Sequence, residues 1–189
     1  YVVEVETDVT RGLHAFSVVG LPDKAVEEAR DRMSAAIKHA GLVPPKSTNK
    51  KIIISLAPAS LKKEGAVFDL PMAISYIQAA GEVALDTKGV AFAGELSLDG
   101  SLRPIRGALS IALAAHKNGL TSLVLPTENA AEASLVRDIT IIPAQTLVQV
   151  IDHLRIEKPK KIPLYERTAR ATKEYGAPLD DIRGHAVRR

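Results

Sequence analysis

The chain has 189 residues, of which 46% are apolar, and it carries a formal net charge of +3. This composition is typical of one globular domain with an extension. The absence of cysteine excludes disulfides and thiolate metal sites, and no apolar run approaches the roughly 18 to 20 residues of a membrane span. We therefore expect a cytoplasmic protein without membrane contact. Because the chain opens without Met and inside a strand-like alternation, we also expect it to be a fragment of a longer protein.

The first half of the chain predicts two strands, a helix and a third strand. Alternating apolar and polar residues over 2–9 are typical of a half-buried strand, and 13–19 predicts a second. Arg11-Gly12 is typical of a turn, so these two strands are expected to pair as a hairpin. Pro22 and Asp23 then signal the start of a helix that ends at Gly41. The apolar run 52–56 predicts a strand buried on both faces.

The second half alternates helices and strands. Helices are predicted over 69–80, 107–116, 128–136 and 145–154, and strands over 90–97, 123–125 and 139–142. Asp99-Gly100 is a strong hairpin signal. The alternation indicates an α/β or α+β class, and the turns favour a mixed sheet over a purely parallel one. The Lys/Pro-rich residues 155–164 are typical of a linker, and residues 165–175 predict a further helix.

Two segments carry most of the functional information, namely residues 56–71 and 92–107. Together with residues 19–26 and 30–41, they resemble the N-terminal Lon-protease-like domain of the ComM/YifB family, whose members are magnesium-chelatase-like AAA+ ATPases. The resemblance implies a Lon-protease-like, ribosomal-S5-domain-2-like fold over residues 1–154. It further implies a basic linker at 155–178 and the truncated start of an AAA+ module at 179–189. No phosphate-binding G-x-x-x-x-G-K-[ST] loop occurs in the sequence.

The peptidase chemistry of Lon proteases is predicted to be lost. The resemblance places Val67 where those enzymes carry the nucleophilic serine, and Ile111 where they carry the general-base lysine. Valine has no hydroxyl, and isoleucine cannot move a proton. Ser110 is one place away from the lysine position and has no basic partner. These two positions are therefore expected to be degenerate, with no catalytic residue in this chain.

Two readings of the function remain open. In the first, the domain is a non-catalytic module that supports assembly and DNA engagement of a hexameric, ATP-driven branch-migration helicase in natural transformation. In the second, it is a module of a magnesium chelatase or a residual hydrolase, which requires converging polar groups beside Val67 and Ile111. Acidic side chains near the two segments could converge, although Asp69 could equally cap a helix N-terminus; these acids are Glu64, Asp69, Glu95 and Asp99.

Ligands and partners follow mainly from the resemblance. No metal site is predicted from the five histidines, and no cofactor is expected in this fragment, whereas ATP and Mg²⁺ are expected for the full-length protein. The expected partners are the AAA+ module of the same chain, five further copies in a hexamer and DNA. Cations of the two segments and of the linker are the candidate nucleic-acid contacts: Lys62, Lys63, Arg103, Arg106, Lys158, Lys160 and Lys161.

Overall fold

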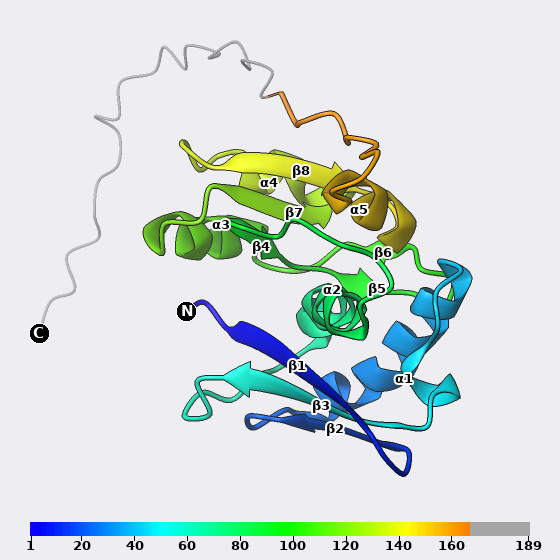
Figure 1. Ribbon diagram of the computed structural model, residues 1–189. Helices are drawn as coiled ribbons and strands as arrows, with labels where there is room; N and C mark the ends of the chain where they lie inside the picture. Colours follow the sequence, from blue (N-terminus) through cyan, green and yellow to red (C-terminus); the bar gives the residue numbers. More distant parts are fainter. Residues whose placement is uncertain (167–189) are drawn as a thin grey trace, which may run out of the picture.

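A computed structural model describes residues 1–166 as two three-stranded sheets and a two-stranded one, with helices between and around them (Figure 1). The strands are β1 (Glu4–Arg11), β2 (Ala15–Val19), β3 (Lys50–Ala57), β4 (Val90–Phe92), β5 (Glu95–Leu96), β6 (Leu102–Arg103), β7 (Ser122–Pro126) and β8 (Thr140–Ala144). The α-helices are α1 (Lys24–His39), α2 (Asp69–Ala80), α3 (Ala108–Lys117), α4 (Ala130–Ala133) and α5 (Leu147–Leu154). Short 3₁₀ turns are η1 (Pro45–Ser47), η2 (Ala66–Phe68) and η3 (Thr127–Asn129).

The first sheet has the strand order β1-β3-β2. β3 runs antiparallel to β1 and parallel to β2, so it lies between the two strands that were expected to form a hairpin. That expectation was wrong, because the short turn after Arg11 joins two strands that are separated by a third. The prediction that β3 is buried on both faces was also wrong. Ile52 and Ile54 are fully buried beneath the helices, whereas Ile53 on the other face is only half-buried.

The second sheet is parallel, with the order β4-β7-β8. Alternate residues of its strands belong to two different clusters. Val124 and Ile142 pack in the cluster that contains α1, α2 and α5, whereas Leu123 and Ile141 pack in a second, smaller cluster with α3 and α4. The sheet is therefore covered on both faces. The molecule combines a small mixed sheet with a small parallel one, so the predicted mixed α/β class is confirmed.

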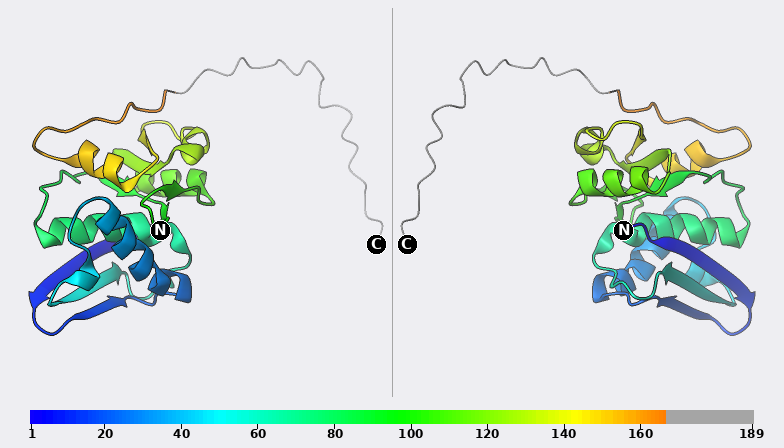
Figure 2. Two further views of the ribbon diagram at one scale, coloured as in Figure 1. Left: turned by 90° about the vertical axis from the view of Figure 1, so that its right-hand side faces the viewer. Right: turned by 90° about the vertical axis from the view of Figure 1, so that its left-hand side faces the viewer.

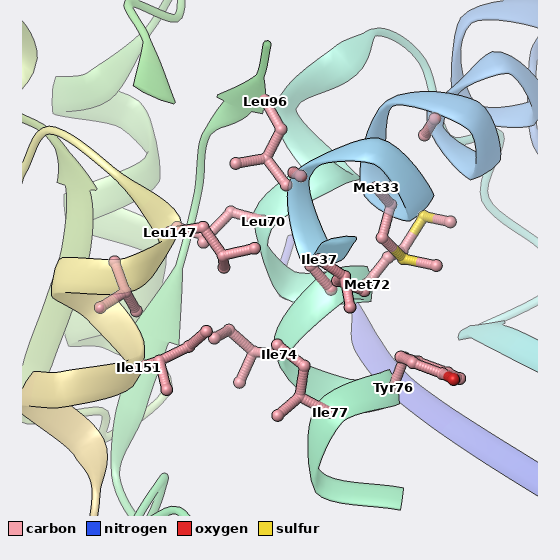
Figure 3. Packing of buried hydrophobic residues seen from close by; sticks show 14 of the residues in the cluster. Met33, Ile37, Leu70, Met72, Ile74, Tyr76, Ile77, Leu96, Leu147 and Ile151 are labelled. Carbon is pink, nitrogen blue, oxygen red and sulfur yellow. The ribbon is translucent and has the colours of Figure 1, made fainter. Parts of the chain in front are cut away.

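Helix α2 lies between the two sheets and holds them together. It is seen end-on at the centre of Figure 1, with the first sheet on one side and the second sheet on the other, and the side views agree (Figure 2). Leu70 and Ile74 of α2 point toward α5, while Met72 points toward Met33 of α1 (Figure 3). All four side chains are buried. This helix has the bounds predicted from the sequence, 69–80.

Two local signals also form as predicted. Asp23 caps α1 by accepting a hydrogen bond from the Val26 N–H at 2.8 Å. The Asp99-Gly100 turn joins β5 and β6 in antiparallel pairing, and the Asp99 carboxylate accepts a hydrogen bond from the Ser101 N–H at 3.0 Å. The predicted strand 90–97 is divided into β4 and β5. Ala93 still donates its N–H to the Val124 carbonyl of β7, whereas Gly94 bonds the segment around Val67 instead, so the strand is interrupted there.

Residues 155–166, here called the strap, run back along α5 without regular secondary structure. Lys160 donates its backbone N–H to the Asp152 carbonyl at 2.8 Å, and Tyr165 donates its N–H to the Ile141 carbonyl at 3.0 Å. The remainder of the predicted linker, most of the predicted helix over 165–175 and the segment 179–189 lie outside the described residues. No helix in the described part of the chain is long and apolar enough to cross a membrane.

Candidate functional site

Val67 and Ile111, the two degenerate peptidase positions, line the same cavity. Val67 lies in η2 just before α2, and Ile111 lies in the first turn of α3. Both side chains are half-buried, and both pack against the second hydrophobic cluster. The cavity has a volume of about 390 Å³ and lies between β1, α2, β4 and α3.

The two informative segments are joined by backbone hydrogen bonds around this cavity. Gly94 donates its N–H to the Val67 carbonyl at 3.1 Å, and Leu70 donates its N–H to the Gly94 carbonyl at 3.0 Å. Gly65 precedes η2 with φ +83° and donates its N–H to the Asp23 carboxylate at 3.0 Å. These bonds fix where the Val67 side chain lies relative to α3.

The lining of the cavity is mostly apolar. Among the described residues, its polar side chains are those of Tyr1, Ser75, Gln78 and Thr87, and it contains no Lys, His, Asp or Glu. The Ser75 hydroxyl is already engaged, at 2.7 Å from the Thr7 hydroxyl and 3.2 Å from the Val5 carbonyl. A serine without a neighbouring base is a weak nucleophile. The described lining therefore lacks a nucleophile–base pair.

Of the four acids, Glu64, Asp69 and Asp99 are each engaged by a different partner. Asp69 is fully buried and makes a bidentate ion pair with Arg32 of α1, with distances of 2.7 Å to Nε and 3.0 Å to Nη2. It also accepts the Leu96 N–H at 3.1 Å. Asp69 does not take the alternative role of a helix cap either, because α2 has no side-chain cap. Glu64 pairs with Lys62, and Asp99 bonds Ser101 within its own turn.

Burial and ion pairing shift the pKa values of Asp69 and Arg32 in opposite directions. Burial raises the pKa of Asp69 above its ordinary value, while the bonds from Arg32 and from the Leu96 N–H lower it. The hydrogen bond to Asp69 raises the pKa of Arg32. The guanidinium therefore stays charged, and the bidentate geometry fixes α1 against the start of α2.

The candidate nucleic-acid cations differ in burial and in their partners. Lys63 is only 1% exposed, and its ammonium donates to the Pro58 carbonyl, so in this structure it cannot reach a phosphate. Lys62 is ion-paired with Glu64 at 2.7 Å, and Arg103 donates to the Ser97 hydroxyl at 2.5 Å. Arg106 is exposed.

Two of the three candidate cations in the strap contact α5. Lys160 pairs with Asp152 at 3.3 Å, Lys161 donates to the His153 carbonyl at 2.8 Å, and Lys158 is exposed. Within the part of the chain that the structure describes, no group of three or more His, Asp or Glu side chains could hold a metal ion.

Comparison with known proteins identifies the family. The model for "Subunit ChlI of Mg-chelatase" matches residues 5–129, a span that contains both informative segments and most residues that line the cavity. The chain belongs to this family.

Individual relatives agree with this assignment. The chain is 38% identical, over its whole length, to an uncharacterised protein of Mycobacterium tuberculosis, of which it covers 37%. It is 40% identical to the competence protein ComM of Haemophilus influenzae over 86% of this chain and 31% of that protein. It is 37% identical to YifB of Escherichia coli over 84% of this chain and 31% of that protein. The chain thus spans about a third of the length of these relatives.

A more distant similarity links the chain to a peptidase. The Lon protease of Rhizobium meliloti is 28% identical over 65% of this chain and 16% of its own length. The resemblance to the ComM/YifB proteins, with a distant similarity to Lon proteases, is thereby confirmed.

Sequence reasoning missed Arg32, which turns Asp69 into a buried structural residue. Arg32 lies on a helix with many exposed charged residues, so nothing in the local pattern distinguishes it from its neighbours. The burial of Lys63 was equally hidden, since Lys62, Lys63 and Glu64 read as a solvated run. The sequence does show an acid, Asp69, at the start of an otherwise apolar helix. An acid in a helix that is buried requires a hydrogen-bonding or charged partner, so this pattern was the one available sign of such a partner.

Proposed function

We propose that residues 1–154 are a non-catalytic, Lon-protease-like domain that supports assembly and DNA engagement of a larger ATP-driven protein. In this proposal the whole protein is a hexameric branch-migration helicase of the ComM/YifB type that acts in natural transformation. The fold assignment is supported by the distant similarity to Lon protease and by the bonding of the 56–71 and 92–107 segments. The pathway is supported by the similarity to a competence protein.

The absence of catalysis rests on one observation. Val67 and Ile111 line the same apolar cavity, whose described lining contains no basic or acidic side chain. Acyl transfer needs an activated nucleophile and a group that accepts its proton.

A peptidase assay on the full-length protein tests this part. We expect no cleavage of an unstructured protein substrate. The double variant Val67→Ser with Ile111→Lys should also be inactive, because Phe68 and Asp69 alter the loop as well. Wild-type cleavage that a serine-reactive inhibitor abolishes would contradict the proposal.

The assembly role can be tested by removing the domain. In the proposal, ATP and Mg²⁺ bind to an AAA+ module that follows this region, and the domain stabilises a ring of six copies. A full-length protein that lacks residues 1–154 should then bind ATP but form less stable hexamers, as measured by light scattering with a non-hydrolysable analogue. Equal hexamer stability with and without the domain would argue against an assembly role.

Arg103 and Arg106 are two of the seven cations predicted to contact DNA, and they mark one edge of the domain in this proposal. Both side chains are exposed, and neither forms an ion pair among the described residues. Reversing both charges in the full-length protein should weaken binding to duplex DNA and flatten its salt dependence. Unchanged binding by an intact hexamer would remove this edge from the proposal.

The family match favours one alternative, namely a module of a magnesium chelatase. This function would require the full-length protein to support metal insertion into a porphyrin. Absorbance spectroscopy of a porphyrin incubated with the full-length protein, Mg²⁺ and ATP distinguishes the two functions. ATP-dependent metalation would favour the alternative, whereas DNA-stimulated ATP hydrolysis without metalation would favour the proposed function.

A further inference from the structure

The end of the first sheet forms a projecting tip that carries positive charge. The tip is defined here as Arg11, Leu13, His14, Lys50 and Lys51, and it contains the turn between β1 and β2. Because β3 lies between these strands, the turn passes beside the start of β3. Arg11 pairs in register with Lys50, and His14 Nδ1 lies 3.0 Å from the Thr48 carbonyl oxygen. Figure 1 shows this corner projecting at the lower right, at the far end from β8.

The cations of the tip are available to an external ligand. Arg11 and Lys51 are exposed and Lys50 is half-buried. Within residues 1–166, no carboxylate lies within ion-pairing distance of any of the three. By contrast, Lys62 and Lys160 already pair with acids of the domain. The tip therefore offers a phosphate more uncompensated charge than either the loop after β3 or the strap.

The tip presents cations on both faces of the sheet. Side chains alternate along a strand, so Lys50 lies on the same face as Ile52, and Lys51 lies on the opposite face. Arg11, opposite Lys50 in register, shares its face. A sheet layer is about 10 Å thick, and the major groove of duplex DNA is about 12 Å wide. If the sheet end enters the groove, Arg11 and Lys50 would face the phosphates of one DNA strand, and Lys51 would face those of the other.

The apex and the flank of the tip fit the same ligand. Leu13 is 94% exposed at the apex, where an apolar side chain can contact the methyl group of thymine in the major groove. Exposed acids follow along β1, at Glu4, Glu6 and Asp8. They would repel phosphates and so restrict the contact to the end of the sheet. A flat anionic membrane would instead be matched by cations that all point the same way.

We propose that this tip is a nucleic-acid contact of the domain and that it takes the groove of a DNA duplex. The proposal rests on the proposed function, because it names where the domain engages DNA. It places the main contact at the β1–β2 turn and the start of β3, away from the edge that carries Arg103 and Arg106.

The first test measures how the full-length protein binds a labelled duplex of random sequence at several salt concentrations. Arg11→Gln with Lys51→Gln removes one cation from each face. This variant should bind several-fold more weakly at low salt, with the salt slope reduced by about one for each cation lost per engaged copy. Lys88→Gln with Arg137→Gln is the matched control, because both residues are exposed and lie outside the tip. The control should bind like the wild type.

The second test concerns the apex. Leu13→Ser should weaken duplex binding without changing the salt slope, whereas Leu135→Ser, at a leucine that is 54% exposed, should have no effect. Thermal unfolding and light scattering verify that each variant is folded and assembled. If the wild type binds no DNA, the proposed DNA role fails together with the tip. If the wild type binds and the Arg11/Lys51 variant binds equally well, only the tip assignment is overturned. Loss of anionic-vesicle binding by Leu13→Ser, with DNA binding unchanged, would also overturn the tip assignment and favour a membrane ligand.

Discussion

Gly20 occupies a position that excludes every other residue. Its φ is +107°, and a Cβ built there overlaps the carbonyl oxygen of Leu56 in β3. Gly41 is a suitable comparison, because its φ is +77° but the space around it is open. We expect Gly41→Ala to cost about 1 kcal/mol from backbone strain alone. Gly20→Ala should cost about 3 kcal/mol, since steric overlap adds to the strain. Denaturant unfolding of the two variants measures the difference, and equal losses would contradict the overlap.

The Arg32–Asp69 ion pair gives a second prediction at the residue scale. Asp69 has no exposed surface, so removal of Arg32 alone leaves a buried carboxylate without its cation. Arg32→Leu should therefore lower the free energy of unfolding by about 3 kcal/mol or more. The double variant Arg32→Leu with Asp69→Leu should be closer to the wild type, because no unpaired charge remains. A double-mutant cycle with Asp69→Leu alone measures the coupling, and additive losses would refute it.

Single residues were predicted unevenly. The pairing of Val67 with Ile111 came from the family resemblance, and the structure places both on one cavity. The roles of Lys63 and Asp69 were misread, because their partners, Pro58 and Arg32, are set by tertiary packing. A local pattern can show that a charged residue is unusual, but it does not contain the identity of the neighbour that satisfies it.

At the scale of elements, helices were predicted better than strand pairing. The bounds of α2 matched because a helix is stabilised by contacts three and four residues apart, which the sequence displays directly. The pairing of β1 and β2 with β3 depends on a segment more than thirty residues later in the chain. The turn predicted at Arg11-Gly12 does reverse the chain direction between β1 and β2. The local sequence does not show that β3 lies between these two strands.

The strap supplies a prediction on pH. His153 is buried, and its Nδ1 accepts a hydrogen bond from the Ile162 N–H at 2.8 Å. Burial lowers the pKa of His153 below its ordinary value, and the positive charge of Lys161 lowers it further. Asp152 also lies at this contact, paired with Arg155 and Lys160.

The folded state therefore binds a proton to His153 less readily than the unfolded state, whose pKa is about 6.5. Stability from this group is present in full above about pH 6.5 and declines as the pH falls below that value toward the lower folded-state pKa. We expect the Ile162 amide to exchange with solvent faster, relative to unstructured peptide, as the pH falls from about 7 to 5. His153→Gln keeps a neutral acceptor, so protection of that amide should vary less with pH. The same pH dependence in both proteins would exclude His153 as its origin.

At the scale of the whole molecule, nucleotide binding is predicted to lie outside this chain. A phosphate cradle needs successive glycine amides, a lysine and a Ser/Thr hydroxyl in one loop, and residues 1–189 contain no such motif. Calorimetry with ATP and Mg²⁺ should show no binding to this chain at micromolar concentration, whereas the full-length protein should bind. Micromolar affinity of residues 1–189 would contradict the prediction.

The position of β3 between β1 and β2 also has a consequence during synthesis. β1 and β2 leave the ribosome before β3, so they lack this partner until residues 50–57 have been made. Pairing over this separation is slow compared with helix formation, because a long loop must close first. The nascent chain therefore carries two unsatisfied strands for a period set by translation, and unpaired strands are sites of association between chains. Clustering of these nascent chains on one message should thus be greatest before residue 57 emerges and should fall once the sheet can close.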